Sequence, residues 1–239
     1  MMGKREKLNL KIFLMILTIY LIACIYIKMD YRIQYLVAFI IVNTVRKSSK
    51  ARMAFKSGDV TMMFEGKMGF NPINHIGIAD MLILGTLILF NSPIIFGQGR
   101  NLDIKYRLFK DYRKGMLKVG FASIFSTLLV MVTTGILFKY HVNIFSLLNI
   151  SRNSYLFLNL FTLFNYTYIV SASIVLFNLL PLPGFDMFDI VYSYADDDLR
   201  TILFNMNKYS FVFLILIIYI VLNTRIFSSI IYDLLRLIQ

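Results

Sequence analysis

Long apolar blocks separated by short polar segments dominate the chain. Residues 8–27 form the first block, and a second begins near Ile33 and loses its apolar character at Arg46. Further blocks cover residues 116–138, 155–180 and 209–222. A helix needs about 20 apolar residues to cross the hydrocarbon core of a bilayer. The pattern therefore predicts an all-α polytopic bundle in which the helix at residues 1–32 precedes the rest.

Three segments are predicted differently. Residues 58–72 combine β-branched and aromatic residues with turn residues, which suits a small β-hairpin. Residues 76–96 are apolar but interrupted by Asp80, Gly85, Asn91 and Pro93, and we expect this segment not to cross the membrane fully. Residues 226–239 are too short for a clear span and are predicted to form an amphipathic or tilted terminal helix.

Composition supports a membrane environment. Hydrophobic residues make up 58% of the chain, and the mean hydropathy is +0.69. The net charge of +12 does not indicate nucleic acid, because no water-exposed segment is long enough to form a basic binding domain. The cations lie between apolar blocks, as the positive-inside rule describes. We therefore expect lipid bilayer contacts, a bacterial cell membrane location and basic loops on the cytoplasmic side.

Few side chains offer catalytic or metal-binding chemistry. The single cysteine, Cys24, excludes an intramolecular disulfide and a thiolate metal cluster. Ser48 and Ser49 lie between Lys47 and Lys50 and have no nearby base in the sequence, because lysines are charged at neutral pH. His75, His141 and Asp186 are the candidate metal ligands. His141 lies beyond the far end of the 116–138 block, and the two that remain are too few for a closed zinc site.

Two motifs carry a resemblance to a known family. The first pairs Gly58-Asp59 with Asn71-Pro72-x-x-His75, and the second reads Asn178-x-x-Pro181-x-Pro183-x-x-Asp186. Together they resemble the site-2 protease family of intramembrane zinc metallopeptidases, over residues 46–222. The resemblance implies a site-2-protease-like helical bundle with a small embedded β-hairpin, in a single membrane domain. Its protease-like core would span residues 33–190, with C-terminal helices in residues 191–239.

The family's zinc motif has no counterpart in this sequence. In active members a His-Glu-x-x-His helix and the distant aspartate hold zinc, and here the resemblance places Arg46, Lys47 and Lys50 in the register of that helix. Arginine and protonated lysine have no lone pair to offer a metal. The resemblance therefore predicts no zinc, no other cofactor and no enzymatic activity.

Three functions follow as hypotheses. The first is a catalytically inactive family member that binds or regulates a membrane partner, either another membrane protein or a peptide. The alternatives are an intramembrane peptidase with an unrecognised site and a packing subunit of a membrane transport or export complex. For the first, a buried and unpaired Asp186 would cost several kcal/mol. We therefore expect Arg46 or Lys50 within about 4 Å of Asp186, unless Asp186 merely caps a turn at an interface.

Overall fold

The computed structural model describes residues 4–77, 85, 102–209, 212–213, 215–216, 219–220, 226–236 and 238. Within these residues the chain is helical and contains no strand. The long helices are α1 (Lys4–Tyr26), α2 (Tyr31–Ser57), α5 (Tyr112–Lys139) and α7 (Tyr155–Asn178). The short helices are α3 (Thr61–Phe64), α6 (His141–Leu147), α8 (Asp186–Tyr194), α9 (Asp197–Lys208) and α11 (Ile226–Arg236). Two 3-10 turns, η1 (Pro72–Asn74) and η2 (Tyr106–Leu108), complete the described fold.

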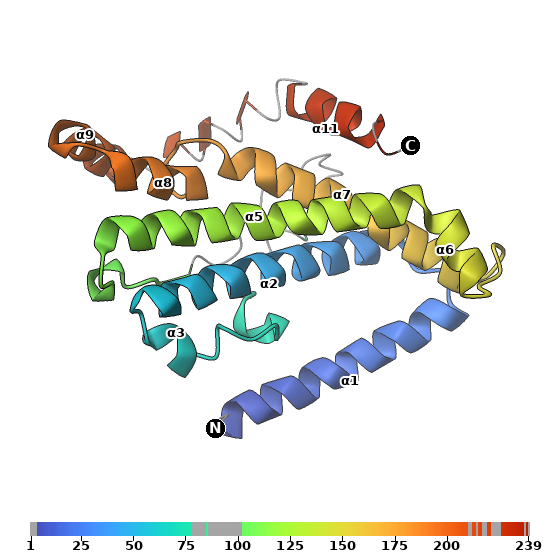
Figure 1. Cartoon of the computed structure of the whole chain (residues 1–239). Coiled ribbons are helices and arrows are strands. Elements are labelled where there is room, and N and C mark those ends of the chain that lie inside the picture. The colour runs from blue at the N-terminus through green and yellow to red at the C-terminus, as the bar shows by residue number, and fades with distance from the viewer. Residues whose placement is uncertain are drawn as a thin grey trace.

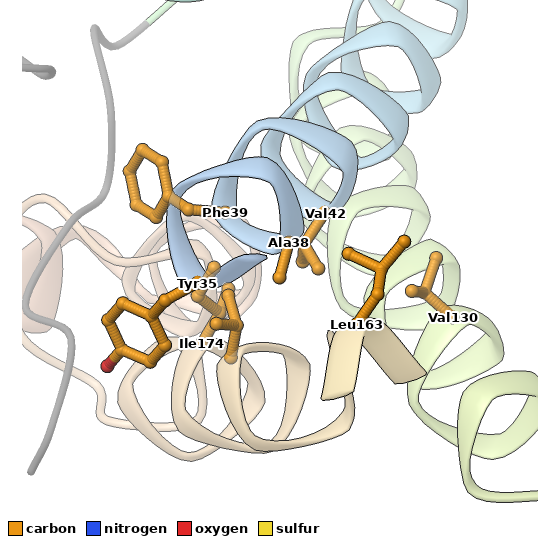
Figure 2. Close-up of a cluster of buried hydrophobic side chains, with 8 residues drawn as sticks. Tyr35, Ala38, Phe39, Val42, Val130, Leu163 and Ile174 are labelled. Atoms are coloured by element: carbon orange, nitrogen blue, oxygen red, sulfur yellow. The ribbon is translucent and has the colours of Figure 1, made fainter. Parts of the chain in front are cut away.

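Helices α2, α5 and α7 pack side by side and form the core (Figure 1). The residues of one face of α2 meet α5 and α7 in a buried apolar cluster (Figure 2). Its members are Tyr35, Ala38, Phe39, Val42, Val130, Leu163, Val170 and Ile174. Each core helix begins at a residue whose side chain accepts a hydrogen bond from the first turn: Asp30, Asp111 and Ser154.

In the part of the chain that the structure describes, three helices are long and apolar enough to cross a membrane: residues 7–26 of α1, α5 and α7. Large apolar side chains such as Phe121, Phe125 and Leu129 are exposed on α5, where lipid would cover them. These features agree with the predicted integral membrane protein. Two cations of α2, Arg46 and Lys47, are by contrast buried inside the bundle.

Helix α1 diverges from α2 and is held mainly near its two ends (Figure 1). Asn159 of α7 donates to the carbonyl oxygens of Cys24 and Ile27 and accepts from the N–H of Met29. At the other end, Asn9 donates to the side-chain oxygen of Asn74. The buried Asn159 therefore satisfies carbonyl groups that the end of α1 leaves without an intrahelical partner.

The predicted β-hairpin at residues 58–72 is wrong. Asp59 accepts hydrogen bonds from the N–H and hydroxyl of Thr61, which starts the helical turn of α3. The N–H groups of Glu65 and Lys67 then bond to carbonyl oxygens only four and five residues earlier. These local bonds occupy the backbone groups that a ladder between two strands would need.

The prediction that residues 76–96 do not cross the membrane lies outside the described residues, except at residues 76, 77 and 85. The apolar block at residues 209–222 is described only in part. The predicted terminal helix at residues 226–239 is present as α11, which packs against α7.

Gly58 fixes the junction between α2 and the loop that precedes α5. Its φ is 129°, which a side chain disfavours, and a Cβ there would lie 2.5 Å from the carbonyl oxygen of Leu108. The N–H of Lys110 donates to the carbonyl oxygen of Ser57 at 2.9 Å, and Asp59 accepts from the N–H of Lys105. The loop is thereby held against the end of α2.

We expect Gly58→Ala to destabilise the protein by about 1–3 kcal/mol, because alanine strains the positive φ and collides with the loop. The measurement is thermal unfolding of the detergent-solubilised protein. Gly69→Ala is the matched control, since a Cβ at Gly69 meets only one atom, at 3.8 Å. Equal melting temperatures for the two variants would contradict this account of the junction.

Candidate functional site

The polar centre of the bundle is a group of four charged side chains, Arg46, Lys50, Asp186 and Asp189, which we call the charge cluster. Arg46 and Lys50 lie one turn apart on α2 and share one face of that helix. Asp186 and Asp189 lie one turn apart in the first turn of α8. The cluster thus joins two helices far apart in the sequence.

The chain segment between α7 and α8 brings Asp186 to this position. Helix α7 ends at Asn178, and the turn that follows contains Pro181, Pro183 and Gly184, whose φ is 95°. Gly120 allows α8 to approach α5 closely, because a Cβ there would lie 2.6 Å from Ile190 and 3.0 Å from the carbonyl oxygen of Asp186. The prolines are thus part of the turn that leads to the carboxylate.

Asp186 accepts bonds on both carboxylate oxygens. Nη2 of Arg46 lies 2.8 Å from Oδ2, and Nζ of Lys50 lies 2.6 Å from Oδ1. The hydroxyl of Ser123 on α5 donates to Oδ2 at 2.5 Å. These contacts confirm the expected ion pair and rule out the alternative in which Asp186 only caps its own turn.

Asn178 supports the same group from α7. Its side-chain oxygen accepts from Nη2 of Arg46 at 2.9 Å and from the N–H of Asp186 at 3.3 Å. Ser123 also accepts from Nε of Arg46. Asn178, Ser123, Arg46 and Asp186 are all buried, so the inner half of the charge cluster is sealed and fully hydrogen-bonded.

The outer half of the cluster is more open. Lys50 lies 3.7 Å from Asp189, and the side chains of these two residues are 17% and 20% exposed. The hydroxyl of Tyr106 in η2 donates to Asp189 at 2.8 Å. The cluster therefore has a closed side at Arg46 and an accessible edge at Lys50 and Asp189.

The two carboxylates differ in their electrostatics. Burial raises the pKa of Asp186, but the charges of Arg46 and Lys50 and the bonds from Lys50 and Ser123 outweigh it and hold that pKa far below its ordinary value. Burial raises the pKa of Asp189 above its ordinary value, although Lys50 and Tyr106 oppose this. Asp186 thus stays ionised to lower pH than an ordinary aspartate, and Asp189 is the carboxylate that takes up a proton first.

The cluster does not fit a zinc ion. Both cations are donors without acceptor atoms, and each oxygen of Asp186 already accepts from one of them. In the described part of the chain, no group of three or more His, Cys, Asp or Glu residues is placed to hold a metal. Whether Arg46, Lys47 and Lys50 correspond to the family's zinc motif is still a prediction.

Ser48 and His75, which the sequence did not connect, are close together. Oγ of Ser48 lies 3.1 Å from Nε2 of His75, so Ser48 does have a potential base nearby, contrary to expectation. However, Nε2 lies 2.7 Å from the carbonyl oxygen of Gly69, which can only accept, so Nε2 carries the proton. Ser48 donates to the same oxygen at 2.6 Å. In this arrangement His75 cannot withdraw the proton of Ser48.

The remaining motif residues position the chain. Lys47 donates to the carbonyl oxygen of His75 at 2.6 Å, and burial lowers the pKa of His75, which is therefore neutral at pH 7. Asn71 accepts from the N–H of Ile73, and Pro72 is the first residue of η1. His141 bonds to the carbonyl oxygen of Phe138, away from the charge cluster.

Three members of the site escaped the sequence-based prediction: Ser123, Tyr106 and Asp189. Asp189 could have been predicted from the sequence, because it follows Asp186 by one helical turn and so lies on the same face of the helix. Ser123 and Tyr106 could not have been predicted in this way, since their contacts depend on how α5 and η2 pack against α8.

Comparison with known proteins agrees with the resemblance. The chain is 27% identical, over 186 residues, to a protein of Bacillus subtilis (strain 168) named putative zinc metalloprotease YwhC. The aligned part is 77% of this chain and 80% of the relative. No family model and no solved structure matches the chain. The similarity supports a site-2-protease-like relationship.

This similarity corrects one prediction. The sequence motifs predicted that the chain is not an enzyme, whereas the relative is named as a zinc metalloprotease. The name points to a protease, so the prediction of a non-enzyme is contradicted.

We expect Asp186→Ala to lower stability by about 3–5 kcal/mol, because it leaves the buried Arg46 without its anion and Lys50 without the nearer of its two anions. Adding Lys50→Met should restore part of the loss, with a coupling of about 0.5–3 kcal/mol in a double-mutant cycle of thermal unfolding. The control is Asp197→Ala, which breaks an exposed pair with Arg200 worth about 0–1 kcal/mol. Strictly additive effects of Asp186→Ala and Lys50→Met would refute the coupling.

The pH dependence of this stabilisation follows from the depressed pKa of Asp186. The unfolded carboxyl group has a pKa of about 3.9. The stabilisation is therefore fully present above that value and is lost as the pH falls through the lower folded-state pKa. In thermal unfolding from pH 7 downward, the difference between the wild type and Asp186→Ala should stay constant to about pH 5 and shrink below about pH 4. A difference that vanishes above pH 5 would contradict the assignment.

Proposed function

We propose that this chain is a site-2-protease-like membrane protein whose core binds a segment of another membrane protein. The similarity to a named zinc metalloprotease supports the first half of the proposal. Binding of a membrane segment is a step that a protease and a regulator of this kind share, so the proposal does not depend on the reaction.

The observation that carries the binding proposal is the one-sided exposure of the charge cluster. Arg46 and Asp186 are sealed, while Lys50 and Asp189 present a donor and an acceptor at the accessible edge. Ionisable groups inside a membrane bundle are costly and usually serve a function. A purely structural ion pair would need only the sealed half.

The chemistry of this edge suits an unwound peptide segment. Where a membrane helix unwinds, backbone N–H and C=O groups lose their partners, and each costs several kcal/mol in hydrocarbon unless the protein satisfies it. The ammonium of Lys50 can donate to a carbonyl oxygen of such a segment. The carboxylate of Asp189, whose second partner is Tyr106, can accept from an N–H.

A photoreactive benzoyl-phenylalanine in place of Tyr106 tests this idea in native membranes. Tyr106 contacts Asp189, so the probe should crosslink a membrane protein at the cluster edge. The same probe in place of Leu147 in α6, at the other end of α5, is the matched control. We expect an adduct with Tyr106 and not with Leu147, and a several-fold loss of it when Lys50→Met is added. An adduct unchanged by Lys50→Met would contradict binding at this edge.

The name of the relative favours a second candidate function, hydrolysis of the bound segment. The captured partner supplies the substrate for a direct test. The purified chain and the partner are incubated in detergent, and two complementary fragments are sought by mass spectrometry. Fragments that form with the wild type, and several-fold fewer with Lys50→Met, would show that the segment bound at the edge of the charge cluster is cleaved. A partner that stays intact would mean that the chain binds the segment without cleaving it.

A further inference from the structure

A second surface, independent of the proposed function, lies where α2 ends and α5 begins. Its cations are exposed and come from the last turn of α2, the loop before α5 and the first turns of α5. They are Lys56, Lys105, Arg107, Lys110, Arg113, Lys114 and Lys118. Asp103 and Asp111 are the exposed acids among them, and Asp111 is paired with Lys114. We call this group of cations the basic collar.

The basic collar is held together by the junction at Gly58. Asp59 binds both Thr61 of α3 and the N–H of Lys105, and Lys110 is bonded to the last residue of α2. The loop and α3 are therefore neighbours. Figure 1 shows α3 beside the end of the bundle where α5 begins, opposite to α6.

Exposed apolar side chains stand beside these cations. Phe64 is 77% exposed, and Val60, Met63 and Leu108 are about half exposed. In a purely water-facing loop, such side chains would leave an apolar patch in contact with water. Beside a membrane-spanning helix, they can enter the acyl region while the cations stay at the level of the headgroups.

We propose that the basic collar and the apolar side chains of α3 form a binding surface for anionic phospholipid. Helix α5 is a candidate span that begins at Tyr112, so the residues just before it lie at the membrane–water boundary. Juxtamembrane cations attract anionic headgroups, and the neighbouring apolar side chains add affinity for the chains of the same lipid. An acidic protein would satisfy the cations but would not explain exposed Phe64 at this depth.

The test uses the full chain, which contains no tryptophan. Phe64→Trp places a single indole within the surface, and Leu147→Trp places one at the other end of the bundle, where Leu147 is 84% exposed. Each variant is reconstituted in vesicles of phosphatidylcholine and phosphatidylglycerol, with bromine on the acyl chains of one lipid or the other. Bromine quenches indole fluorescence only at short range.

We expect the indole of Phe64→Trp to be quenched more strongly by brominated phosphatidylglycerol than by brominated phosphatidylcholine at equal mole fraction. The indole of Leu147→Trp should show no preference. Equal quenching of Phe64→Trp by the two lipids would overturn the proposal, as would an indole that neither lipid quenches.

A charge-matched pair of triple variants isolates the cations. Lys105→Gln, Arg107→Gln and Lys110→Gln together should abolish the preference of the Phe64→Trp reporter for phosphatidylglycerol. Lys28→Gln, Lys139→Gln and Arg152→Gln remove the same charge from the opposite end and should leave the preference unchanged. Loss of the preference in both triple variants would mean that net charge alone attracts the lipid, and the proposed surface would be wrong. Helix content by circular dichroism verifies that each variant is folded.

Discussion

The neutralisation of Asp186 is the constraint on which the rest of the core depends. A carboxylate sealed inside a membrane bundle cannot keep its charge unless cations and hydrogen-bond donors replace the water it has lost. Arg46 and Lys50 supply the charge, and Ser123 supplies a further donor. The positions of α2, α5 and α7 and of the turn after Asn178 together bring these partners to the carboxylate of Asp186.

Packing and electrostatics reinforce each other here. The absence of a side chain at Gly120 lets α8 approach α5, which brings Asp186 within reach of Ser123. The apolar cluster of α2, α5 and α7 fixes the face of α2 that carries Arg46. A substitution in the apolar part of the core would thus be felt in the charge cluster, since both depend on the same helix positions.

The long helices and the ion pair were predictable from the sequence for physical reasons. Apolar blocks of sufficient length specify spanning helices, and residues four apart on α2 must share a face. The resemblance predicted that the α2 segment with Arg46 and Lys50 lies close to the motif that ends at Asp186. Because an unpaired buried carboxylate is costly, these two cations were then expected to pair with Asp186. Asn178 belongs to the same motif, but its bonds to Arg46 and Asp186 were not predicted.

Other parts of the site depend on contacts that no local pattern records. Residues 58–72 satisfy their backbone groups locally through Asp59 and successive turns, so their β-branched and aromatic residues do not form strands. Ser48 and His75 meet only because η1 folds back on α2. Tyr106 reaches Asp189 only because Gly58 and Asp59 hold the loop against α2.

The distance along the chain between the charged partners has a consequence for synthesis. Asp186 follows Arg46 by 140 residues, and Asn159 follows Cys24, whose carbonyl oxygen it binds, by 135. Because chains emerge from the ribosome N-terminus first, α2 is made before its counter-ions exist. Its cations must remain near water, or be sheltered by the insertion machinery, until α8 is made. The closing of the bundle around α2 is therefore a late event, timed by translation of the segment that carries Asp186.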